Sequence, residues 1–456
     1  MRDKIVLVYP TYDGPPLGPP LSLLSLASPL LEAGFRVRVL DGAVDRVEEL
    51  LEREIADALC VGISFLTGPM IRGAVAISRH VRRLRPDIPI IFGGWHSSLL
   101  PEETLRSGLA DVIVRGQGER TLVELAHHFR EGESSMRIDG TSFSEGEHAV
   151  HNPDRRAENI NNFPTPAFSL ADFDAYERQT GQRKLPFASS LGCPYACHYC
   201  TDQVFYERRF NAYPAGRVVS EVVDLVGRYR LQSVAFLDSN FPVNVRRAVD
   251  IARGFTEAKI RFEWTFQAST DLLCRMSDDD VCLLGESGVT HMGFGTESAS
   301  ERVLEWMNKK HQRIDEMFET ARKSEKAGIR VTFNLILGYP GETDADRRET
   351  FHVMSEIFRK HSNVSFSPNI FTPYPGIPIW PQLRAMGVRE PGTLEEWADV
   401  GLGSNHLPWL QGQELRRLKS MLKEFLQNNR RTRLERKKLV TRRSLLTGQA
   451  LRSEGL

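Results

Sequence analysis

Disulfide frameworks, membrane spans and a strong charge of one sign are all missing from this sequence. Its 456 residues include only six cysteines, far below the density of disulfide-stabilised secreted domains. No apolar run approaches the roughly 20 residues of a transmembrane helix. The opening MRDKIVLVYPTYDGPP is typical of a first strand and not of a signal peptide. Lysine and arginine total 59, as do aspartate and glutamate, so no overall charge favours nucleic acid. These absences predict a globular cytoplasmic protein with no transmembrane segment and no nucleic-acid partner.

The first part of the chain alternates short β-rich runs with segments of helical length. The expected strands are 3–9, 36–41, 58–65, 88–94 and 111–115. Such alternation favours a parallel sheet that is covered by helices on both faces. We therefore predict that the protein is of the α/β class and begins with a doubly wound, Rossmann-like domain over residues 1–135. Ligands of such domains bind at the carboxyl ends of the strands.

A second alternation of strands and helices follows after a polar stretch. Residues 136–185 lose the rhythm and are interpreted as a linker with at most one small hairpin. Residues 186–400 contain six expected strands, fewer than the eight of a closed barrel, so we predict a partial (βα)6 barrel. Residues 401–456 are expected to form a helical extension. Its basic stretch 430–443 is interpreted as a solvated helix face, with docking to an acidic partner or an anionic membrane as the alternative.

Three of the six cysteines lie close together, directly after the first expected strand of the barrel. They are Cys193, Cys197 and Cys200 in the segment SSLGCPYACHYC. Thiolates bind iron–sulfur clusters, and three thiolates on a four-iron cubane leave one iron open for another ligand. A structural zinc site wants four ligands at a different spacing, and the fourth could only be His198 or a distant residue. The spacing therefore predicts a 4Fe–4S cluster, with zinc as the disfavoured alternative.

This cysteine loop resembles the signature of the radical S-adenosylmethionine (SAM) superfamily. The resemblance covers residues 186 to about 375. It implies that the open iron binds SAM and that one-electron reduction yields a 5′-deoxyadenosyl radical. Further motifs similar to those of the family are FLDSNF, GFGTESAS and ILGYPGET. Together with the cysteine loop, they imply that SAM is contacted by Tyr199, Asp238, Ser239, Asn240, Gly295, Glu297, Ser298, Gly338 and Gly341. Many members of the superfamily carry an arginine near the end of the third strand, where this chain has Gln267 and Ser269.

A doubly wound domain before such a barrel resembles the arrangement in cobalamin (B12)-dependent radical SAM enzymes. The resemblance implies that cobalamin is bound by Ser64, Leu66, Gly93, Gly94, His96, Gly116, Gly118 and Glu119. The glycine pair is expected to let a flat macrocycle approach the backbone. The sequence has no Asp-x-His-x-x-Gly motif, so we expect base-off cobalamin without a histidine ligand. His96 is the nearest candidate for that ligand, but a loop histidine is more often a polar contact. A nucleotide or no ligand is the alternative for this domain.

The resemblance implies an enzyme that binds a 4Fe–4S cluster, SAM and cobalamin. The reaction it favours is methyl transfer from methylcobalamin to an unactivated carbon. Ring contraction, oxidative cyclisation and carbon–carbon bond formation remain alternatives, as does a non-catalytic iron–sulfur protein. A flavodoxin- or ferredoxin-type donor is the expected source of electrons, and a small molecule, lipid or peptide is the expected substrate. Tyr374 and Trp380 could line the substrate pocket or form a turn that closes the barrel.

Overall fold

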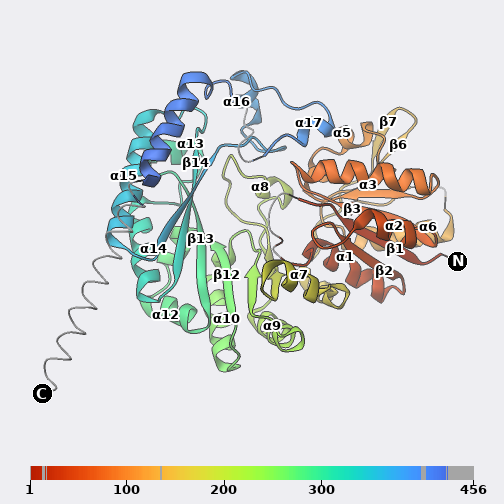
Figure 1. Cartoon of the computed structure of the whole chain (residues 1–456), viewed down its shortest axis with the longest axis horizontal. Coiled ribbons are helices and arrows are strands. Elements are labelled where there is room, and N and C mark those ends of the chain that lie inside the picture. The colour runs from red at the N-terminus through yellow and green to blue at the C-terminus, as the bar shows by residue number, and fades with distance from the viewer. Residues whose placement is uncertain are drawn as a thin grey trace, which may run out of the picture.

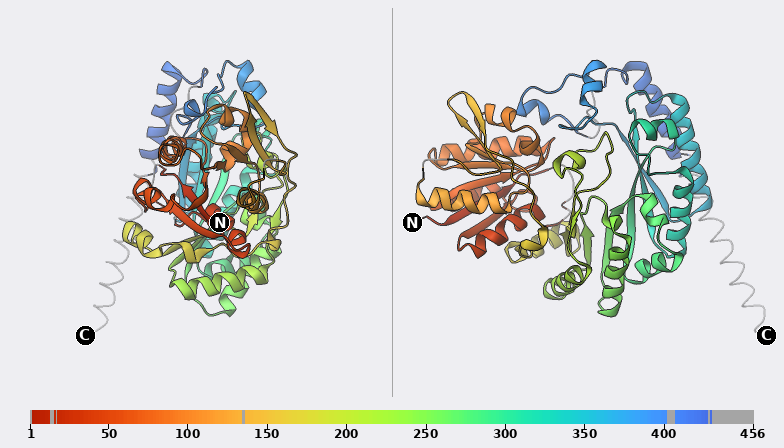
Figure 2. Two further views of the ribbon diagram at one scale, coloured as in Figure 1. Left: turned by 90° about the vertical axis from the view of Figure 1, so that its right-hand side faces the viewer. Right: turned by 180° about the vertical axis from the view of Figure 1, so that it is seen from behind.

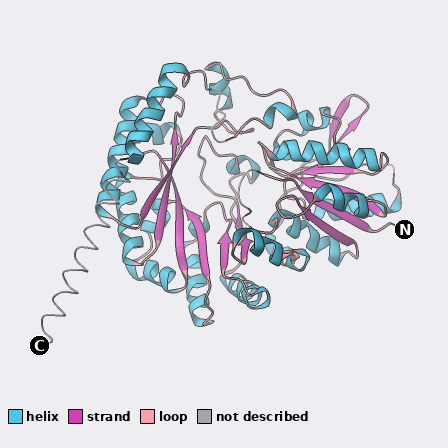
Figure 3. Cartoon of the chain, viewed as in Figure 1, coloured by secondary structure: helices cyan, strands magenta, loops and turns pink. Residues whose placement is uncertain are grey.

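The structure is a computed structural model that describes residues 2–12, 16, 18–133, 136–401, 407–427 and 429. Two sheets with helices on their faces lie side by side, and their carboxyl-terminal edges are turned toward each other (Figure 1, Figure 3). The stretch 430–443 lies outside the described residues. None of the helices in the described part of the chain has the length and apolarity that a membrane span requires. The predicted α/β class, with a Rossmann-like domain before a partial barrel, is confirmed.

The first sheet begins with five parallel strands. They are β1 (Lys4–Tyr9), β2 (Arg36–Asp41), β3 (Ala58–Ser64), β4 (Ile90–Gly93) and β5 (Val112–Val114). Their spatial order is β2-β1-β3-β4-β5, so the order reverses between β1 and β3. Ligands of open α/β sheets bind in the crevice at such a reversal, outside the carboxyl ends of the strands. The helices are α1 (Leu21–Glu32), α2 (Val47–Glu54), α3 (Met70–Leu84), α4 (Trp95–Leu99), α5 (Pro101–Arg106) and α6 (Glu119–Glu131).

Part of the segment interpreted as a linker belongs to this first sheet. The hairpin of β6 (Thr141–Glu145) and β7 (His148–His151) extends the sheet antiparallel to β5. Arg115 holds the hairpin by donating hydrogen bonds to the carbonyl oxygens of Thr141 and Asn152, both at 2.6 Å. A small hairpin is expected in this segment, but its place in the first sheet is not, because its strands are polar and largely exposed and carry no hydrophobic alternation. The remainder of the segment contains α7 (Phe173–Thr180).

The second sheet has six parallel strands in the same order in space as in the sequence. They are β8 (Lys184–Phe187), β11 (Ser233–Phe236), β12 (Glu263–Ala268), β13 (Val289–Glu297), β14 (Arg330–Leu337) and β15 (Val364–Ile370). The first and last of them form the two ends of the sheet, so the barrel is open. Figure 2 shows the helices along its outer face. They are α9 (Ala215–Tyr229), α10 (Val245–Glu257), α12 (Asp278–Glu286), α14 (Ile314–Lys326) and α15 (Asp344–Lys360).

After β15 the chain crosses from the barrel to the first domain and returns. The crossing segment contains α16 (Trp380–Ala385) and α17 (Leu394–Trp397), and α17 packs against α3 (Figure 1). Residues 412–427 then form a helix along α15. There the ring of Phe425 stacks on that of Phe351, with centroids 4.7 Å apart. The two domains are thus joined both by the chain that leads into β8 and by the crossing segment after β15.

Candidate functional site

The three clustered cysteines lie in a loop that a short hairpin closes. The hairpin pairs β9 (Ser190–Leu191) with β10 (Asn211–Ala212), and the loop between them contains α8 (Asp202–Phe205). Gly192 starts the loop with a φ of +77°, and a Cβ there would lie 2.1 Å from the carbonyl oxygen of Arg209. Only glycine fits such a left-handed position with so close an approach of the backbone. The local sequence LGC therefore directs the cysteines away from the strand.

The chemistry of this donor set fits an iron–sulfur cluster. Cys197 is buried, Cys193 and Cys200 are half-buried, and all three are free thiols. Burial raises the pKa of Cys193 to about 11 and that of Cys200 to about 12. These thiols therefore stay protonated at neutral pH unless a metal displaces their protons, as metals do. The described residues contain no group of three or more His, Cys, Asp or Glu side chains arranged to hold a single metal ion. A cubane instead binds each thiolate at a different iron.

The end of α13 (Glu301–Trp306) and the residues directly after it contact the cysteine loop. The backbone N–H of His198 donates to the carbonyl oxygen of Met307 at 2.9 Å. The Nδ1 atom of the same histidine lies 3.0 Å from the carbonyl oxygen of Trp306. The Asn308 side chain donates to the carbonyl oxygen of Ala196 at 2.7 Å. Residues 306–309 therefore fix the part of the loop between Cys197 and Cys200, and we call them the brace.

Tyr199 and Glu297, both predicted to contact SAM, meet at a buried charge pair. The Tyr199 hydroxyl donates to Oε1 of Glu297 at 2.9 Å and accepts from Nζ of Lys309 at 3.1 Å. Nζ of Lys309 also lies 3.7 Å from Oε1 of Glu297. Burial raises the pKa of Glu297, and the ammonium opposes that rise. Glu297 ends β13 with a φ of +58°, and strained backbone of this kind clusters at functional sites.

Asp238 holds the turn that leads into the cysteine loop. Its carboxylate accepts from the backbone N–H of Ser189 at 2.9 Å and from the hydroxyl of the same residue at 2.6 Å. It also accepts from the hydroxyl of Ser190 at 2.5 Å. Burial raises the pKa of Asp238, and these three donors oppose the rise. The structure thus gives Asp238 a positioning contact with the turn before the cysteines, while its predicted contact with SAM stays a prediction.

Ser239 and Asn240 also connect neighbouring strand ends. The Ser239 hydroxyl donates to Oδ1 of Asp202 at 2.6 Å. The Asn240 side chain accepts from the backbone N–H of Ser269 at 3.2 Å and donates to its hydroxyl at 3.1 Å. Ser269 stands where many superfamily members have an arginine nearby, so this strand end is held by amide and hydroxyl groups. The two residues lie beside the cysteine loop, as predicted contacts of SAM should.

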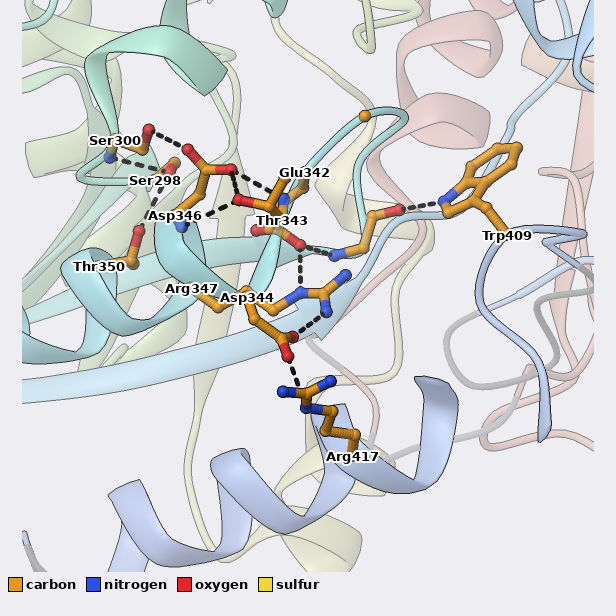
Figure 4. A network of polar contacts seen from close by, with 12 residues as sticks. Ser298, Ser300, Glu342, Thr343, Asp344, Asp346, Arg347, Thr350, Trp409 and Arg417 are labelled. Atoms are coloured by element: carbon orange, nitrogen blue, oxygen red, sulfur yellow. Dashed lines mark hydrogen bonds and ion pairs between the residues drawn. The ribbon is translucent and has the colours of Figure 1, made fainter. Parts of the chain in front are cut away.

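The loop GYPGE after β14 is fixed by a buried ion pair (Figure 4). Glu342 accepts from the backbone N–H of Gly338 at 2.5 Å and from Nε of Arg347 at 2.8 Å. The indole N–H of Trp409 donates to the carbonyl oxygen of Gly338 at 3.0 Å. Both glycines of the loop have positive φ, and a Cβ at Gly341 would lie 2.0 Å from the Trp306 ring. The predicted adenine-binding loop is therefore rigid before any ligand binds.

Figure 4 also shows how this loop is joined to the end of β13. The hydroxyls of Ser298 and Thr350 lie 3.1 Å apart, and Thr350 accepts from the backbone N–H of Ala299. Asp346 accepts from the hydroxyl of Ser300 at 2.7 Å. The hydroxyl of Ser298, a predicted SAM contact, thus points to α15 within the protein.

Replacing Arg347 with methionine is expected to destabilise the barrel strongly. The change leaves the carboxylate of Glu342 buried without its partner, which costs about 3–5 kcal/mol. The matched control is Arg417→Met, because Arg417 pairs with Asp344 from a side chain that is 53% exposed. That variant should lose about 1 kcal/mol or less. Denaturant titration of the full chain measures the free energy of unfolding of both variants. Equal losses in the two variants would contradict the assignment of Arg347 and Glu342 as a stabilising buried ion pair.

A cleft opens between the two domains at the carboxyl ends of β1, β3, β4 and β5. Its cavity volume is about 350 Å³. Seven of the eight residues predicted to bind cobalamin line it: Ser64, Leu66, Gly93, Gly94, Gly116, Gly118 and Glu119. The opposite wall comes from the barrel and from α8, with Ala188, Leu191, Phe205, Tyr206 and Leu237. Leu66 and Leu237 are each 46% exposed there, and apolar side chains left exposed in a cleft mark a binding site.

The two glycines at the end of β4, Gly93 and Gly94, have different roles in this cleft. Ile91 and Gly93 both line it, because alternate residues of a strand face the same side. A Cβ at Gly93 would meet nothing closer than the carbonyl oxygen of Val114 at 3.9 Å, so it would project into the open cleft. A Cβ at Gly94, where φ is +93°, would lie 2.4 Å from the carbonyl oxygen of Phe65. Gly93 therefore keeps the cleft clear, whereas Gly94 lets two loops cross.

Sequence reasoning missed two features of the cleft. Gln117, between the two predicted glycines of the RGQGE loop, has a buried Nε2 with no hydrogen-bond partner among the described residues. This amide lines the cleft and can donate to the amide carbonyls around a corrin, so the cleft fits cobalamin. Trp95 stacks on Phe205 of α8 with ring centroids 4.8 Å apart. The glutamine lies within the RGQGE motif, which points to it. No local sequence pattern predicts the contact between Trp95 and Phe205, because the two residues are far apart in the chain.

His96 does not line the cleft, and its contacts agree with the interpretation of this histidine as a polar contact rather than a ligand of cobalt. Its ring is fully buried, with Nδ1 3.0 Å from the Thr67 hydroxyl and Nε2 3.5 Å from Oε2 of Glu103. The physical reason is the start of α4 at Trp95. Successive helix residues point about 100° apart, so Trp95 faces the cleft while His96 faces α5 and α17.

Tyr374 and Trp380 likewise lie outside the cleft. The Trp380 indole is buried and donates to the carbonyl oxygen of Tyr374 at 2.7 Å. Its ring meets that of Trp397 edge-on, with centroids 6.2 Å apart. These contacts hold the crossing segment together, in line with the alternative of a closing turn, and give no support to a role in lining a substrate pocket.

Known proteins share both halves of this arrangement. Residues 5–126 match the B12 binding domain family and residues 188–354 match the radical SAM superfamily. The chain is 29% identical to the uncharacterized methyltransferase PH0819 of Pyrococcus horikoshii, over 83% of this chain and 82% of that protein. It is 24% identical to the hopanoid C-3 methylase of Methylococcus capsulatus, over 79% and 68%. It is 25% identical to the anaerobic magnesium-protoporphyrin IX monomethyl ester cyclase of Cereibacter sphaeroides, over 84% of this chain and 64% of that one.

Solved structures share the fold. The radical SAM methyltransferase TsrM of Kitasatospora setae, with cobalamin and an iron–sulfur cluster bound, superposes with a TM-score of 0.73. The match has 20% identity and covers 86% of this chain and 76% of that one. The cobalamin-dependent SAM radical enzyme OxsB superposes with a TM-score of 0.68 at 16% identity, over 84% and 60%. The fold of this chain is therefore shared with TsrM, whose structure holds cobalamin and an iron–sulfur cluster, and with OxsB, whose structure holds cobalamin and SAM.

Proposed function

Because the chain belongs to the radical SAM enzymes that carry a B12-binding domain, we propose that it transfers a methyl group to an unactivated carbon of its substrate. When bound, the cluster and SAM supply a radical that removes a hydrogen atom, and cobalamin supplies the methyl group. The observation that carries the proposal is the wall shared by the two sites. α8 starts directly after Cys200 and Thr201 and ends by presenting Phe205 to the cleft.

The chain's own residues bind the cluster and SAM and exclude water from them. Cys193, Cys197 and Cys200 hold the cluster in a loop that the brace and the hairpin keep in place. Tyr199 and Glu297 orient SAM through a hydroxyl and a carboxylate that a buried ammonium holds together. The apolar and aromatic side chains of Leu191, Phe205, Tyr206 and Leu237 line the barrel side of the cleft, where they would limit the access of water to a radical.

On the cobalamin side, the wall is built from backbone and apolar groups. Gly93 leaves room for a flat macrocycle, Leu66 offers an apolar surface, and Gln117 offers its free amide donor. With His96 turned away, no histidine lines the cleft in the described part of the chain. We therefore propose that cobalamin binds base-off without a histidine ligand, and that Ser64, Gly116, Gly118 and Glu119 complete the site.

The proposal includes an outside source of electrons and a reducing compartment. Apart from the clustered thiols, Cys60 lies in β3, Cys274 in α11 (Thr270–Cys274) and Cys282 in α12, too scattered to build a second cluster. A flavodoxin- or ferredoxin-type protein would therefore supply the single electron. Free thiols persist in reducing compartments, which supports the cytoplasm as the location. The substrate is a small molecule, lipid or peptide that presents the carbon to the cleft.

A second candidate is a radical cyclisation without methyl transfer. It is favoured by the similarity to the anaerobic cyclase of Cereibacter sphaeroides, which covers 84% of this chain. Methyl transfer is preferred because PH0819, to which the chain is 29% identical, is named a methyltransferase.

Product analysis with SAM that carries a deuterated methyl group tests the proposal. The anaerobically reconstituted chain is incubated with dithionite and SAM, with and without added cobalamin. We expect 5′-deoxyadenosine in both samples and S-adenosylhomocysteine only where cobalamin is present, because only methyl transfer leaves that coproduct. With the substrate present, the two coproducts should form in near-equal amounts and the deuterated methyl group should enter the product. No cobalamin-dependent S-adenosylhomocysteine would exclude methyl transfer and favour the cyclase reaction.

A further inference from the structure

The two faces of the barrel sheet differ in chemistry. On the outer face, the indole N–H of Trp264 in β12 donates to the carbonyl oxygen of Ser287, directly after α12, at 3.1 Å. Phe294 and Phe333 are fully buried on the same face of the neighbouring strands. Successive side chains of a strand point to opposite faces, so the residues between these point inward. The inward side chains toward the carboxyl ends of β12, β14 and β15 are polar, and we call them the inner face: Gln267, Thr332, Asn334, Ser365, Ser367 and Asn369.

The inner face is not filled by packed side chains. A closed barrel fills its interior with bulky branched residues. Here Gln267 is exposed although β12 lies inside a six-stranded sheet, and Asn334 is half-buried. The amide of Gln267 lies across Gly293 of the next strand, where a Cβ would be 2.2 Å from its Oε1 atom. Neither Gln267 nor Asn334 has a side-chain hydrogen bond to another described residue, so both amides are available to a ligand.

These two amides lie beside the residues predicted to contact SAM. Asn334 pairs with Gly295 across the sheet, and a Cβ at Gly295 would lie 2.6 Å from Oε1 of Glu297. Gln267 pairs with Gly293, which precedes Gly295 by two residues and therefore lies on the same face. Glu297 ends its strand, whereas the two amides lie inside β12 and β14. A molecule on the inner face would therefore be next to SAM but held by different side chains.

The chemistry of the inner face matches an uncharged amide. A side-chain amide offers one acceptor oxygen and two N–H donors, and another amide satisfies both kinds of group at once. The six side chains of the inner face carry no charge, so a charged group of a ligand would be buried there without a partner. We propose that Gln267 and Asn334 are specificity-determining residues that bind an uncharged amide group of the substrate. The inference rests on the proposed function, because it requires a substrate beside SAM.

The test is the binding of trifluoroacetamide to the holoenzyme, followed by fluorine NMR. The full chain carries its cluster and cobalamin and is saturated with SAM without a reductant, so that no turnover occurs. We expect saturable binding, with a dissociation constant that rises about fivefold in Gln267→Met and in Asn334→Leu, the loss typical of one neutral hydrogen bond. Gln382→Met removes an exposed amide of α16 and should leave the binding unchanged. Trifluoroacetate, an anion of similar size, should show no saturable binding.

The iron content and the dissociation constant of SAM are measured on the same samples. Both should stay unchanged in the two variants, because neither amide holds another described side chain in place. The proposal is overturned if trifluoroacetamide does not bind, if both variants bind it as the unchanged chain does, or if both lose iron. A matching rise in the dissociation constant of SAM would assign the amides to the SAM site and also overturn it. Absence of iron from the unchanged protein would instead refute the proposed function.

Discussion

Replacing Cys193, Cys197 or Cys200 with alanine is expected to remove the iron–sulfur cluster and abolish the cleavage of SAM. Three thiolates bind three of the four irons of a cubane, so each of them is needed. The described residues around the loop offer no spare cysteine. The unchanged chain should bind about four irons after anaerobic reconstitution. Each single variant should lose most of that iron, and its rate of 5′-deoxyadenosine formation should fall to background.

The matched controls are Cys274→Ala and Cys282→Ala, since both thiols are half-buried like Cys193 and Cys200 but lie in α11 and α12 and not in the cysteine loop. Their iron content and SAM cleavage should equal those of the unchanged chain. A loop variant that keeps full iron and full cleavage would contradict the assignment of the cluster. A control that loses iron would show that other thiols contribute.

Gly93→Val is expected to prevent cobalamin binding while the cluster site stays intact. The valine side chain would project into the cleft where the macrocycle must approach, since a Cβ at this position meets no atom closer than 3.9 Å. The affinity should fall at least about tenfold, which corresponds to about 1.4 kcal/mol. The absorbance spectrum of bound cobalamin, titrated into the purified chain, gives the affinity and shows whether the cofactor is base-off.

The control for this change is Gly227→Val, at an exposed glycine of α9 where a Cβ meets nothing within 4 Å. Its cobalamin affinity and SAM cleavage should both be unchanged. Gly94→Val would be less informative, because its side chain would strike Phe65 and displace the loop itself. Full cobalamin binding by Gly93→Val, or a base-on spectrum in the unchanged chain, would refute the proposed cobalamin site.

The features that the sequence predicted well are local in the chain. Strands such as β1 are buried on both faces, so they read as continuous apolar runs, with Ile5 to Val8 at most 1% exposed. The cysteine spacing is likewise local, since three ligands within one loop need no knowledge of the fold. The glycine-rich loops at strand ends were predicted for the same reason, because a positive φ or a close approach of the backbone requires glycine at a single position.

The features that the sequence could not predict depend on contacts between distant segments. The support of the cysteine loop comes from residues about 110 positions later, as the 3.1 Å contact from Lys309 to Tyr199 shows. The direction of His96 depends on the residue at which a five-residue helix begins, and propensities do not fix that residue. The ring contact between Trp95 and Phe205 joins two domains whose relative placement no local pattern encodes.

That ring contact also has a consequence for turnover. Trp95 follows the glycine pair of the first domain, and Phe205 lies five residues after Cys200, so the stack ties the floor of one cofactor site to the loop of the other. The crossing segment fastens the domains a second time through α17. A hinge motion between the domains would have to break both contacts, so both oppose such an opening. Exchange of substrate and product through the mouth of the cleft would leave them intact and would keep the distance between the cysteine loop and the first domain constant during turnover.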